Sequence, residues 1–486
     1  MESKTIRQRQ FSEKWRNSSK HGSSKNGSGT FWAVTGFGKT FGTIEQIIKP
    51  FLNKSISNYI TILVSREVHY HHWVRELNKN IKKNDIRKRV KVITVQYLIK
   101  NDLRLSTDLL IVDELHKFYS EEYIKYVNGD YIQFTYNLGL TATFLDPRGR
   151  HRQILDLYYP IDIISQTEAL EKGWISQFTE YNLTVNLTSQ EKAEYIGYQD
   201  QINKHLPKFG EQGVRAAFLC HRGGKGRNGR SKTAQEWAEQ YASHMGWNSS
   251  MSTNHNIYKL WNPSVIRGYA RRVVENLKNI NDFLYNNDSK YMAAMDILKK
   301  FHNKKIMTFG QSTKFADQLT DWFNKEKLGV AVSYHTQMKS RPLTNQHGEY
   351  IRYKTGQRAG EIKKFGLTTL KKLTIEAFVN GTANVLCTAS AMDENFDCPD
   401  IEVGLITART SNPNKQLQRG GRIKRLLPKD PSAVMLIINL YCQGTKDYDW
   451  LRISQSKNEH YVKWVENIED IDFNIYTEDV YDISDI

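Results

Sequence analysis

The sequence predicts an α/β protein with two doubly wound parallel-sheet lobes, a helical insertion and a short C-terminal extension. Short apolar runs alternate with helical patterns in the first 150 residues, and the same alternation returns after about residue 300. Between the two series lies a stretch with few strand signals, residues 189–301. Alternating strand and helix signals are typical of parallel sheets covered by helices, and 486 residues are enough for more than one domain.

The first predicted lobe spans residues 1–160. Its strand candidates are bounded runs rich in Val, Ile and Leu, which is the pattern of strands buried on both faces. Helical patterns such as "TFGTIEQIIKPFL" and "EVHYHHWVRELNKNI" follow them. The strand candidates are "TFWAV", "YITILVS", "VKVITV" and "DLLIVDE".

The second predicted lobe spans residues 161–450 and carries the helical insertion at 189–301 and a basic insertion at 336–372. Residues 451–486 form a predicted acidic C-terminal extension. The strand candidates of this lobe are "KKIMTFG", "GVAVSYH", "NVLCTAS", "IEVGLIT" and "AVMLIINLY".

Charge is distributed unevenly along the chain. The formal net charge is +17, but the segment from Glu466 to the end holds eight acidic residues and no Lys or Arg. The stretch from Gln201 to Lys232 has eight Lys or Arg, one acid and six glycines, and 336–372 has nine Lys or Arg and two acids. The rest of the chain is so basic that we expect a polyanionic partner, and nucleic acid is the first candidate. The alternative for each basic stretch is a solvated surface loop.

The cysteines and the apolar runs predict an intracellular protein without a membrane span. The four cysteines have neither metal-ligand spacing nor a dense disulfide pattern, so we expect buried free thiols. No run of about 18 apolar residues occurs. The N-terminus "MESKTIRQRQ" does not resemble a signal peptide.

A phosphate-binding loop is the strongest local signal. In "FWAVTGFGKT" a strand ends and Thr35, Gly36, Gly38, Lys39 and Thr40 open a helix. Backbone amides in such a loop cradle phosphates, Lys39 would reach the β- and γ-phosphates of ATP, and Thr40 would hold Mg²⁺. The first loop position is Ala instead of Gly, so a plain turn stays open as the alternative.

An acidic pair supplies what such a loop needs. In "LLIVDELH", Asp113 and Glu114 end an apolar strand. Asp113 can hold the Mg²⁺ shell, and Glu114 can polarise a water for in-line attack. The alternative is an ordinary acidic strand end.

The stretch "QLQRGGRIKR" contains arginines that could bind the same phosphates. Arg422 and Arg425 are three residues apart and share a helix face. If the two lobes face each other, these arginines close on the γ-phosphate as arginine fingers. A solvated basic helix end is the alternative.

Taken in order, these motifs resemble those of superfamily 2 helicases with a "QxxGRxxR" final motif, from about Ile6 to Tyr441. The resemblance implies two RecA-like lobes, ATP and Mg²⁺ as cofactors, and sequence-independent binding of forked, branched or single-stranded DNA. Gln418 belongs to the final motif. "TEALEKGWISQF" and "KYMAAMDILKK" are similar to phage branch-migrating and restriction-type DNA translocases, which implies replication, recombination or repair proteins as further partners.

The resemblance also implies roles for individual residues. Gln10 would read the adenine edge and Asp397 would lie near the nucleotide. His116 would link the ATP and nucleic-acid sites. Residues implied on the nucleic acid are Ser65, Arg66, Thr94, Thr141, Thr143, Thr336 and Thr388. From the charge pattern we add Lys225, Arg227 and Arg230 as contacts to duplex or junction.

The predicted function is an ATP-dependent DNA helicase or translocase that unwinds or branch-migrates forked or branched DNA. Two departures bear on this. Glu394-Asn395 stands where the family has Glu-Gly, and the Asp-Glu-Leu-His box differs from the RNA-helicase boxes, which favours DNA. A double-strand translocase or remodeller, a nucleic-acid-gated ATPase switch and an RNA helicase are the alternatives.

Overall fold

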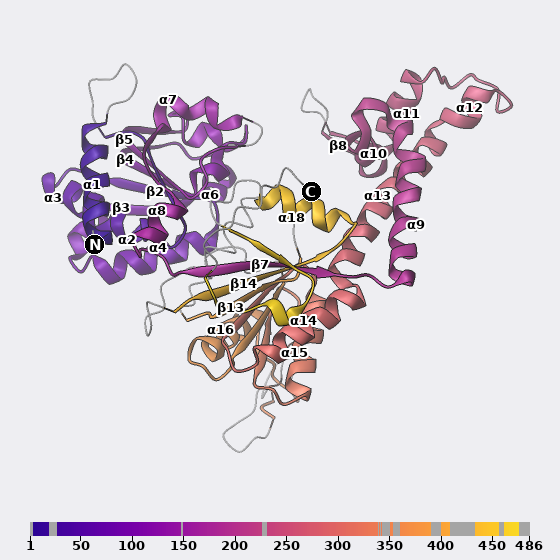
Figure 1. Cartoon of the computed structure of the whole chain (residues 1–486). Helices are drawn as coiled ribbons and strands as arrows, with labels where there is room; N and C mark the ends of the chain where they lie inside the picture. The colour runs from indigo at the N-terminus through magenta and orange to yellow at the C-terminus, as the bar shows by residue number, and fades with distance from the viewer. Residues whose placement is uncertain are drawn as a thin grey trace.

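The computed structural model consists of two parallel β-sheets, each flanked by helices, and a helical arm (Figure 1). This confirms the predicted fold class. The structure describes residues 3–18, 27–146, 149–225, 231–338, 340, 342, 350–352, 360–389, 400–408, 433–455 and 461–475.

The first lobe is built on a six-stranded sheet with the order β3-β2-β4-β5-β1-β6, in which all pairs are parallel. Its strands are β1 Thr30–Ala33, β2 Ile60–Val64, β3 Val90–Thr94, β4 Leu105–Asp113, β5 Ile132–Thr141 and β6 Pro160–Ile164. Its helices are α1 Lys4–Asn17, α2 Lys39–Thr43, π-helix η1 Ile44–Ile48, α3 Lys49–Lys54, α4 Glu67–Asn80, α5 Asn84–Lys88, α6 Val95–Lys100, α7 Leu155–Tyr158 and α8 Gln166–Glu171, with short 3-10 helices η2 Leu115–Phe118, η3 Ile124–Tyr126 and η4 Arg150–Ile154.

Continuous apolar runs form these strands because the sheet is covered on both faces. All five residues of β2 are buried. Alternate residues enter two different clusters, with Ile62 in one and Leu63 in the other. Helix α1 covers part of the first cluster, where Phe11 stacks on Phe31 with ring centroids 3.8 Å apart.

The second lobe has a seven-stranded sheet with the order β11-β12-β10-β13-β14-β7-β15, again parallel throughout. Its strands are β7 Phe178–Val185, β10 Ile306–Gly310, β11 Ala331–Tyr334, β12 Val385–Ala389, β13 Val403–Ile406, β14 Met435–Cys442 and β15 Lys463–Val465. Its helices are α14 Asp288–Lys300, α15 Thr313–Lys325, α16 Leu367–Val379, α18 Lys446–Gln455 and the 3-10 helix η6 Ile468–Asp470.

Two boundaries differ from the prediction. Strand β6 pairs with β1, so the first lobe extends past residue 160 to at least Ile164. Strand β15 pairs with β7, so residues 463–465 belong to the second sheet instead of a separate extension. The pattern of apolar residues indicates where a strand lies but does not indicate which sheet it joins.

The helical arm departs from the end of β7 and returns through α13 to the second lobe (Figure 1). It occupies the predicted insertion. Small side chains, among them Ala216, Ala238 and Ala270, give it a hydrophobic core of its own and let its helices approach closely. Its elements are α9 Ser189–His205, η5 Leu206–Gln212, α10 Gly213–Arg222, β8 Gly224–Lys225, β9 Ser231–Lys232, α11 Ala234–His244, α12 Asn256–Trp261 and α13 Pro263–Asn286.

Cys220, Cys387 and Cys442 are buried free thiols, as expected, and Cys398 lies outside the described residues. Among the residues that the structure describes, no helix combines the length and apolarity needed to cross a membrane.

Candidate ATP and nucleic-acid site

The predicted phosphate loop connects β1 to α2 in the first lobe. Gly36 and Gly38 both have φ of +90°, a conformation that side chains with a Cβ rarely adopt, so glycine is required at these turns. Lys39 begins α2, and its ammonium donates to Ala33 O at 2.9 Å, across the mouth of the loop. The lysine thus lies where a bound triphosphate would replace the carbonyl as its partner.

Side chains of helix α1 donate hydrogen bonds to the backbone carbonyl groups of this loop. Lys4 Nζ donates to Gly36 O at 2.8 Å, and Gln8 Nε2 donates to Phe37 O and Gly38 O at 3.3 Å each. Gln8 is 4% exposed and approaches so closely that a Cβ on Gly42 would lie 2.8 Å from its side-chain amide carbon.

Gln10, the glutamine predicted to contact the nucleotide, is exposed instead. Side chains two positions apart on an α-helix point in directions that differ by about 200° around the helix axis. Gln8 and Gln10 therefore lie on opposite sides of α1. Because Gln8 is the glutamine that contacts the phosphate loop, we propose that it, and not Gln10, has the nucleotide-sensing role.

Gln8→Ala should raise the KM for ATP by about tenfold, since a hydrogen-bonding group at the loop is removed and about 1.4 kcal/mol corresponds to that factor. Gln10→Ala is the matched control on the same helix and should leave KM unchanged. Steady-state ATP hydrolysis at several ATP concentrations measures both. An effect of Gln10→Ala with none of Gln8→Ala would assign the role to Gln10.

Asp113 ends β4 at the same edge of the sheet and is held by α4. Its Oδ2 accepts a hydrogen bond from Trp73 Nε1 at 2.9 Å and lies 3.4 Å from His69 Nδ1. Burial raises the pKa of Asp113, but the contacts with His69 and Trp73 and the charge of Lys39 outweigh it. The pKa therefore lies below its ordinary value, which keeps the carboxylate ionised for a metal ion.

Glu114 follows in a left-handed conformation, with φ of +52°, which is uncommon for a residue with a side chain. Its Oε2 is buried and lies 3.4 Å from His116 Nδ1. That nitrogen is also 3.0 Å from Thr141 Oγ1. Thr141 Oγ1 donates its one hydrogen to Thr143 O at 2.7 Å, so His116 Nδ1 must be the donor to Thr141. His116 therefore connects the acidic pair to the end of β5.

Residues expected on the nucleic acid line the neighbouring strand ends. Ser65 follows β2 and is 3% exposed, and Thr94 ends β3 next to Val64 in the strand register. Arg66 occupies the position before α4 and is exposed, whereas the Thr94 side chain caps α6 by accepting from Tyr97 N at 3.2 Å. The sheet order places β3 and β2 on one side of β4, and β5 and β1 on the other. The predicted track residues and the predicted ATP residues thus share one sheet edge.

Two threonines expected on the nucleic acid are engaged inside the lobes instead. Thr141 is 0% exposed and bonded to His116 and Thr143, and Thr388 is 3% exposed and donates to Thr308 O at 2.7 Å. Their hydroxyls satisfy neighbouring groups, so the structure does not present them to a strand. Thr143 is half-buried and Thr336 is exposed.

Several predicted residues lie outside the described part of the chain. They are Arg227, Arg230, Asp397, Gln418, Arg422 and Arg425. Lys225, in contrast, is the last residue of β8 in the arm.

The residues present fit a Mg²⁺ ion completed by phosphate. Thr40 lies in the first turn of α2 after the loop, and Asp113 supplies an ionised carboxylate. Within the described ranges no group of three His, Cys, Asp or Glu side chains could hold a metal by itself. Mg²⁺ is commonly bound through one or two protein oxygens together with substrate phosphates. Bound there, it would neutralise charge on the phosphates during transfer.

Sequence reasoning missed four side chains that the structure brings to this site, namely Lys4, Gln8, His69 and Trp73. Gln8 could have been found, because it shares a helical face with Phe11 and Trp15. His69 and Trp73 also lie four residues apart on one face, but that pattern is the same as for any buried helix face.

Comparisons with known proteins agree with this geometry. A family model described as "Type III restriction enzyme, res subunit" matches residues 5–146. A curated relative, the DNA 3'-5' translocase XPB2 of Sulfurisphaera tokodaii, is 26% identical over 377 residues, which are 77% of this chain and 67% of the relative. The helicase domain of Pyrococcus furiosus Hef has a similar fold, with a TM-score of 0.50, 15% identity, and coverage of 92% of this chain and 97% of that one.

These matches agree with the structure in two respects. The chain has two parallel-sheet lobes, and its phosphate loop lies beside an Asp-Glu pair. In its two RecA-like lobes and in the order of its motifs, the chain is similar to superfamily 2 helicases and translocases, which are nucleic-acid-dependent ATPases.

Proposed function

We propose that the protein is an ATP-driven DNA motor that acts on forked or branched DNA. The observation that carries this proposal is the shared sheet edge, where Ser65 follows β2, the neighbour of the strand that ends in Asp113, and Thr94 ends β3 on the other side of β2. A DNA strand held at β2 and β3 would be in mechanical contact with the ATP site. The name of the curated relative, a DNA translocase, supports DNA as the track.

Closure of the second lobe onto the ATP would complete the cycle. The phosphate loop of the first lobe supplies Lys39. We propose that Arg422 and Arg425 of the second lobe are the positive charges that reach the γ-phosphate. Backbone contacts on both lobes would then grip one strand at two points whose separation changes with ATP binding and hydrolysis. Contacts to phosphates make such movement independent of base sequence.

We propose that the arm faces the duplex or junction while the lobes grip the tracking strand. Arg267 and Arg271 are exposed on α13 and line a groove of about 590 Å³ together with His221 of α10. Arg267 lies 3.3 Å from Gln235, and the ion pair of Arg271 with Glu275 is open to solvent, so both guanidinium groups can turn to a phosphate.

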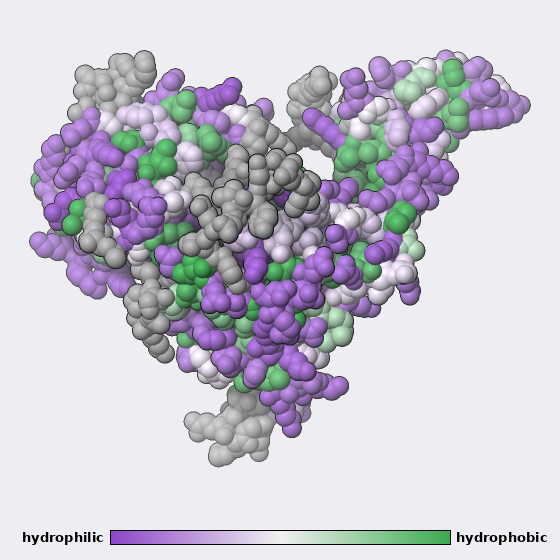
Figure 2. Space-filling model, in the orientation of Figure 1, coloured by the Kyte–Doolittle hydropathy of each residue, from purple (hydrophilic) through white to green (hydrophobic). Residues whose placement is uncertain are grey.

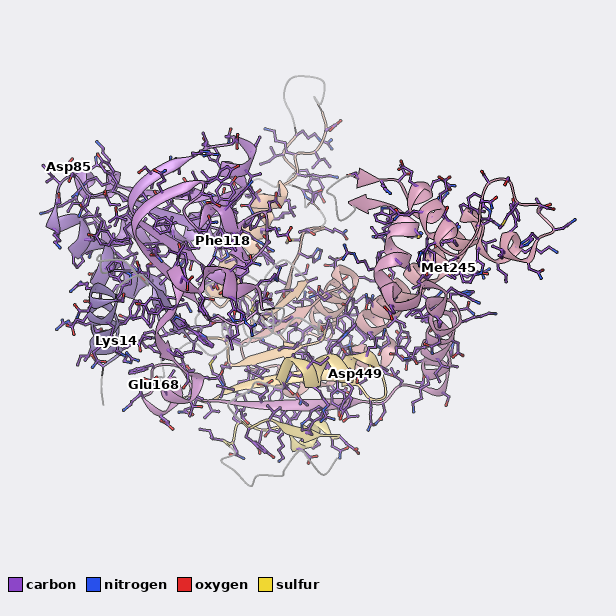
Figure 3. The ribbon with its side chains drawn as sticks, turned by 90° about the horizontal axis from the view of Figure 1, so that it is seen from above. Lys14, Asp85, Phe118, Glu168, Met245 and Asp449 are labelled. Carbon is purple, nitrogen blue, oxygen red and sulfur yellow. The ribbon has the colours of Figure 1, made fainter. Side chains whose placement is uncertain are left out.

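The surface of the arm supports this proposal. Its visible face is mostly hydrophilic with small apolar areas (Figure 2). Seen from above, Met245 on the arm and Phe118 in the first lobe lie on opposite sides of the second lobe (Figure 3). A junction could therefore be contacted at a distance from the ATP site.

A forked-DNA unwinding assay tests the proposed function. Strand separation that requires ATP is the expected result. Displacement of a triplex strand without unwinding would instead support the double-strand translocase, and DNA-stimulated hydrolysis with neither would support the switch. Stimulation by RNA alone would contradict DNA as the track.

Arg267→Ala with Arg271→Ala should weaken binding to forked DNA more than binding to a plain single strand. The slope of log affinity against log salt should flatten by up to about 0.9 for each duplex phosphate that the double variant no longer neutralises. Hydrolysis driven by saturating single strand should stay unchanged, because nothing in the first lobe is altered.

The matched control removes two charges from the opposite end of the molecule. The control variant carries Lys82→Ala and Lys83→Ala. Both lysines closely precede Asp85, which lies far from the arm (Figure 3). This control lowers the net charge by the same amount and should have little effect on fork preference. Equal weakening by both double variants would mean that the arm has no special part in junction binding.

A further inference from the structure

We propose that His69 and Trp73 are positioning residues that fix the carboxylate of Asp113 for its metal ion. Both side chains come from α4 and both contact the same oxygen, Oδ2, with the indole nitrogen at 2.9 Å and the imidazole nitrogen at 3.4 Å. Neither uses Oδ1. One carboxylate oxygen is thus held by two side chains of α4, and we assign Oδ1 to the metal shell.

The two positioning groups are well placed to fix an orientation. Trp73 is 0% exposed and His69 is 2% exposed, so packing limits both side chains to one position. Their separation of four residues puts them on the same face of α4, one turn apart. Groups that orient a metal-ligating side chain commonly change metal affinity by about 10- to 100-fold when they are removed.

Helix α4 gives this arrangement a second consequence. It begins directly after Arg66, one of the residues that we propose to contact the strand. The helix that positions the metal-binding carboxylate therefore starts at the proposed track. A purely structural role for Trp73 would stabilise α4 against the sheet without any specific effect on metal binding, and the two roles can be separated.

The test measures the affinity for a fluorescent ATP analogue in Mg²⁺ and in EDTA. Trp73→Phe keeps the ring and removes the N–H. It should raise the Mg²⁺ concentration needed for half-maximal tightening of nucleotide binding by about 10-fold, while affinity in EDTA is unchanged. Trp15→Phe is the matched control, since Trp15 is also buried in this lobe and its Nε1 donates to Asn137 O at 3.0 Å. This control should show no shift in Mg²⁺ dependence.

A series at His69 keeps the test decisive if Trp73→Phe folds poorly. His69→Leu removes the polar contact and should show the same Mg²⁺-specific shift, whereas His69→Gln retains a donor and should recover most of it. Thermal unfolding in the absence of nucleotide identifies the folded variants. The proposal is overturned if folded variants weaken binding equally in Mg²⁺ and in EDTA, or if they leave the Mg²⁺ dependence unchanged.

Discussion

Lys39→Ala is expected to reduce ATP hydrolysis to background while leaving the fold and most nucleic-acid binding intact. The ammonium already lies across the phosphate loop, 2.9 Å from Ala33 O. Loss of the cation that reaches the β- and γ-phosphates removes charge stabilisation that is needed in the transition state.

Phosphate release measured with saturating single-stranded DNA gives the result. Lys49→Ala is the control, because Lys49 lies on the same helical stretch and forms only a partly exposed pair with Glu45. A folded Lys39→Ala protein with near-normal turnover would contradict the ATP site.

Glu114→Gln should bind ATP but hydrolyse it about 10²- to 10⁴-fold more slowly, which is the usual contribution of a positioned general base. The left-handed backbone at Glu114 and its buried Oε2 beside His116 indicate that this carboxylate is held for a specific task. Since glutamine has the same size, packing should be preserved and the protein should accumulate in the ATP-bound, closed state.

Rapid mixing with labelled ATP separates binding from hydrolysis for this variant. Glu121→Gln, an exposed position in the same lobe, is the matched control and should behave like the unaltered protein. If Glu114→Gln hydrolyses ATP normally, another residue polarises the water.

Much of the first lobe follows from local sequence. Buried apolar runs such as Ile60–Val64 predict strands because both faces of a parallel sheet are covered, and the polar residues directly after them must then meet at one edge. That reasoning placed Asp113 at a strand end without knowledge of the strand order, whereas Ser65 and Thr94 were expected from the resemblance to superfamily 2 helicases.

What could not be predicted depends on side-chain direction and long-range pairing. The sequence motif alone does not choose between Gln8 and Gln10, although the helical face that Gln8 shares with Phe11 and Trp15 favours Gln8. The role of β15 as the seventh strand depends on pairing with β7, which is hundreds of residues earlier in the chain. Thr141 ends β5 and Thr388 lies one residue before the end of β12. A hydroxyl near a strand end can face a ligand or satisfy the backbone, and here both hydroxyls donate to carbonyl groups inside their lobes.

We propose that ATP hydrolysis at the edge of the first sheet moves the protein along DNA. The most direct measurement is the maximal ATP turnover per protein on single-stranded DNA of increasing length, with Lys39→Ala as the negative control. A motor that steps along its track should show turnover that rises with length and then reaches a plateau, because short strands limit the number of steps before dissociation. Turnover that is the same on the shortest strand that binds and on strands many times longer would contradict movement and leave a stationary ATPase.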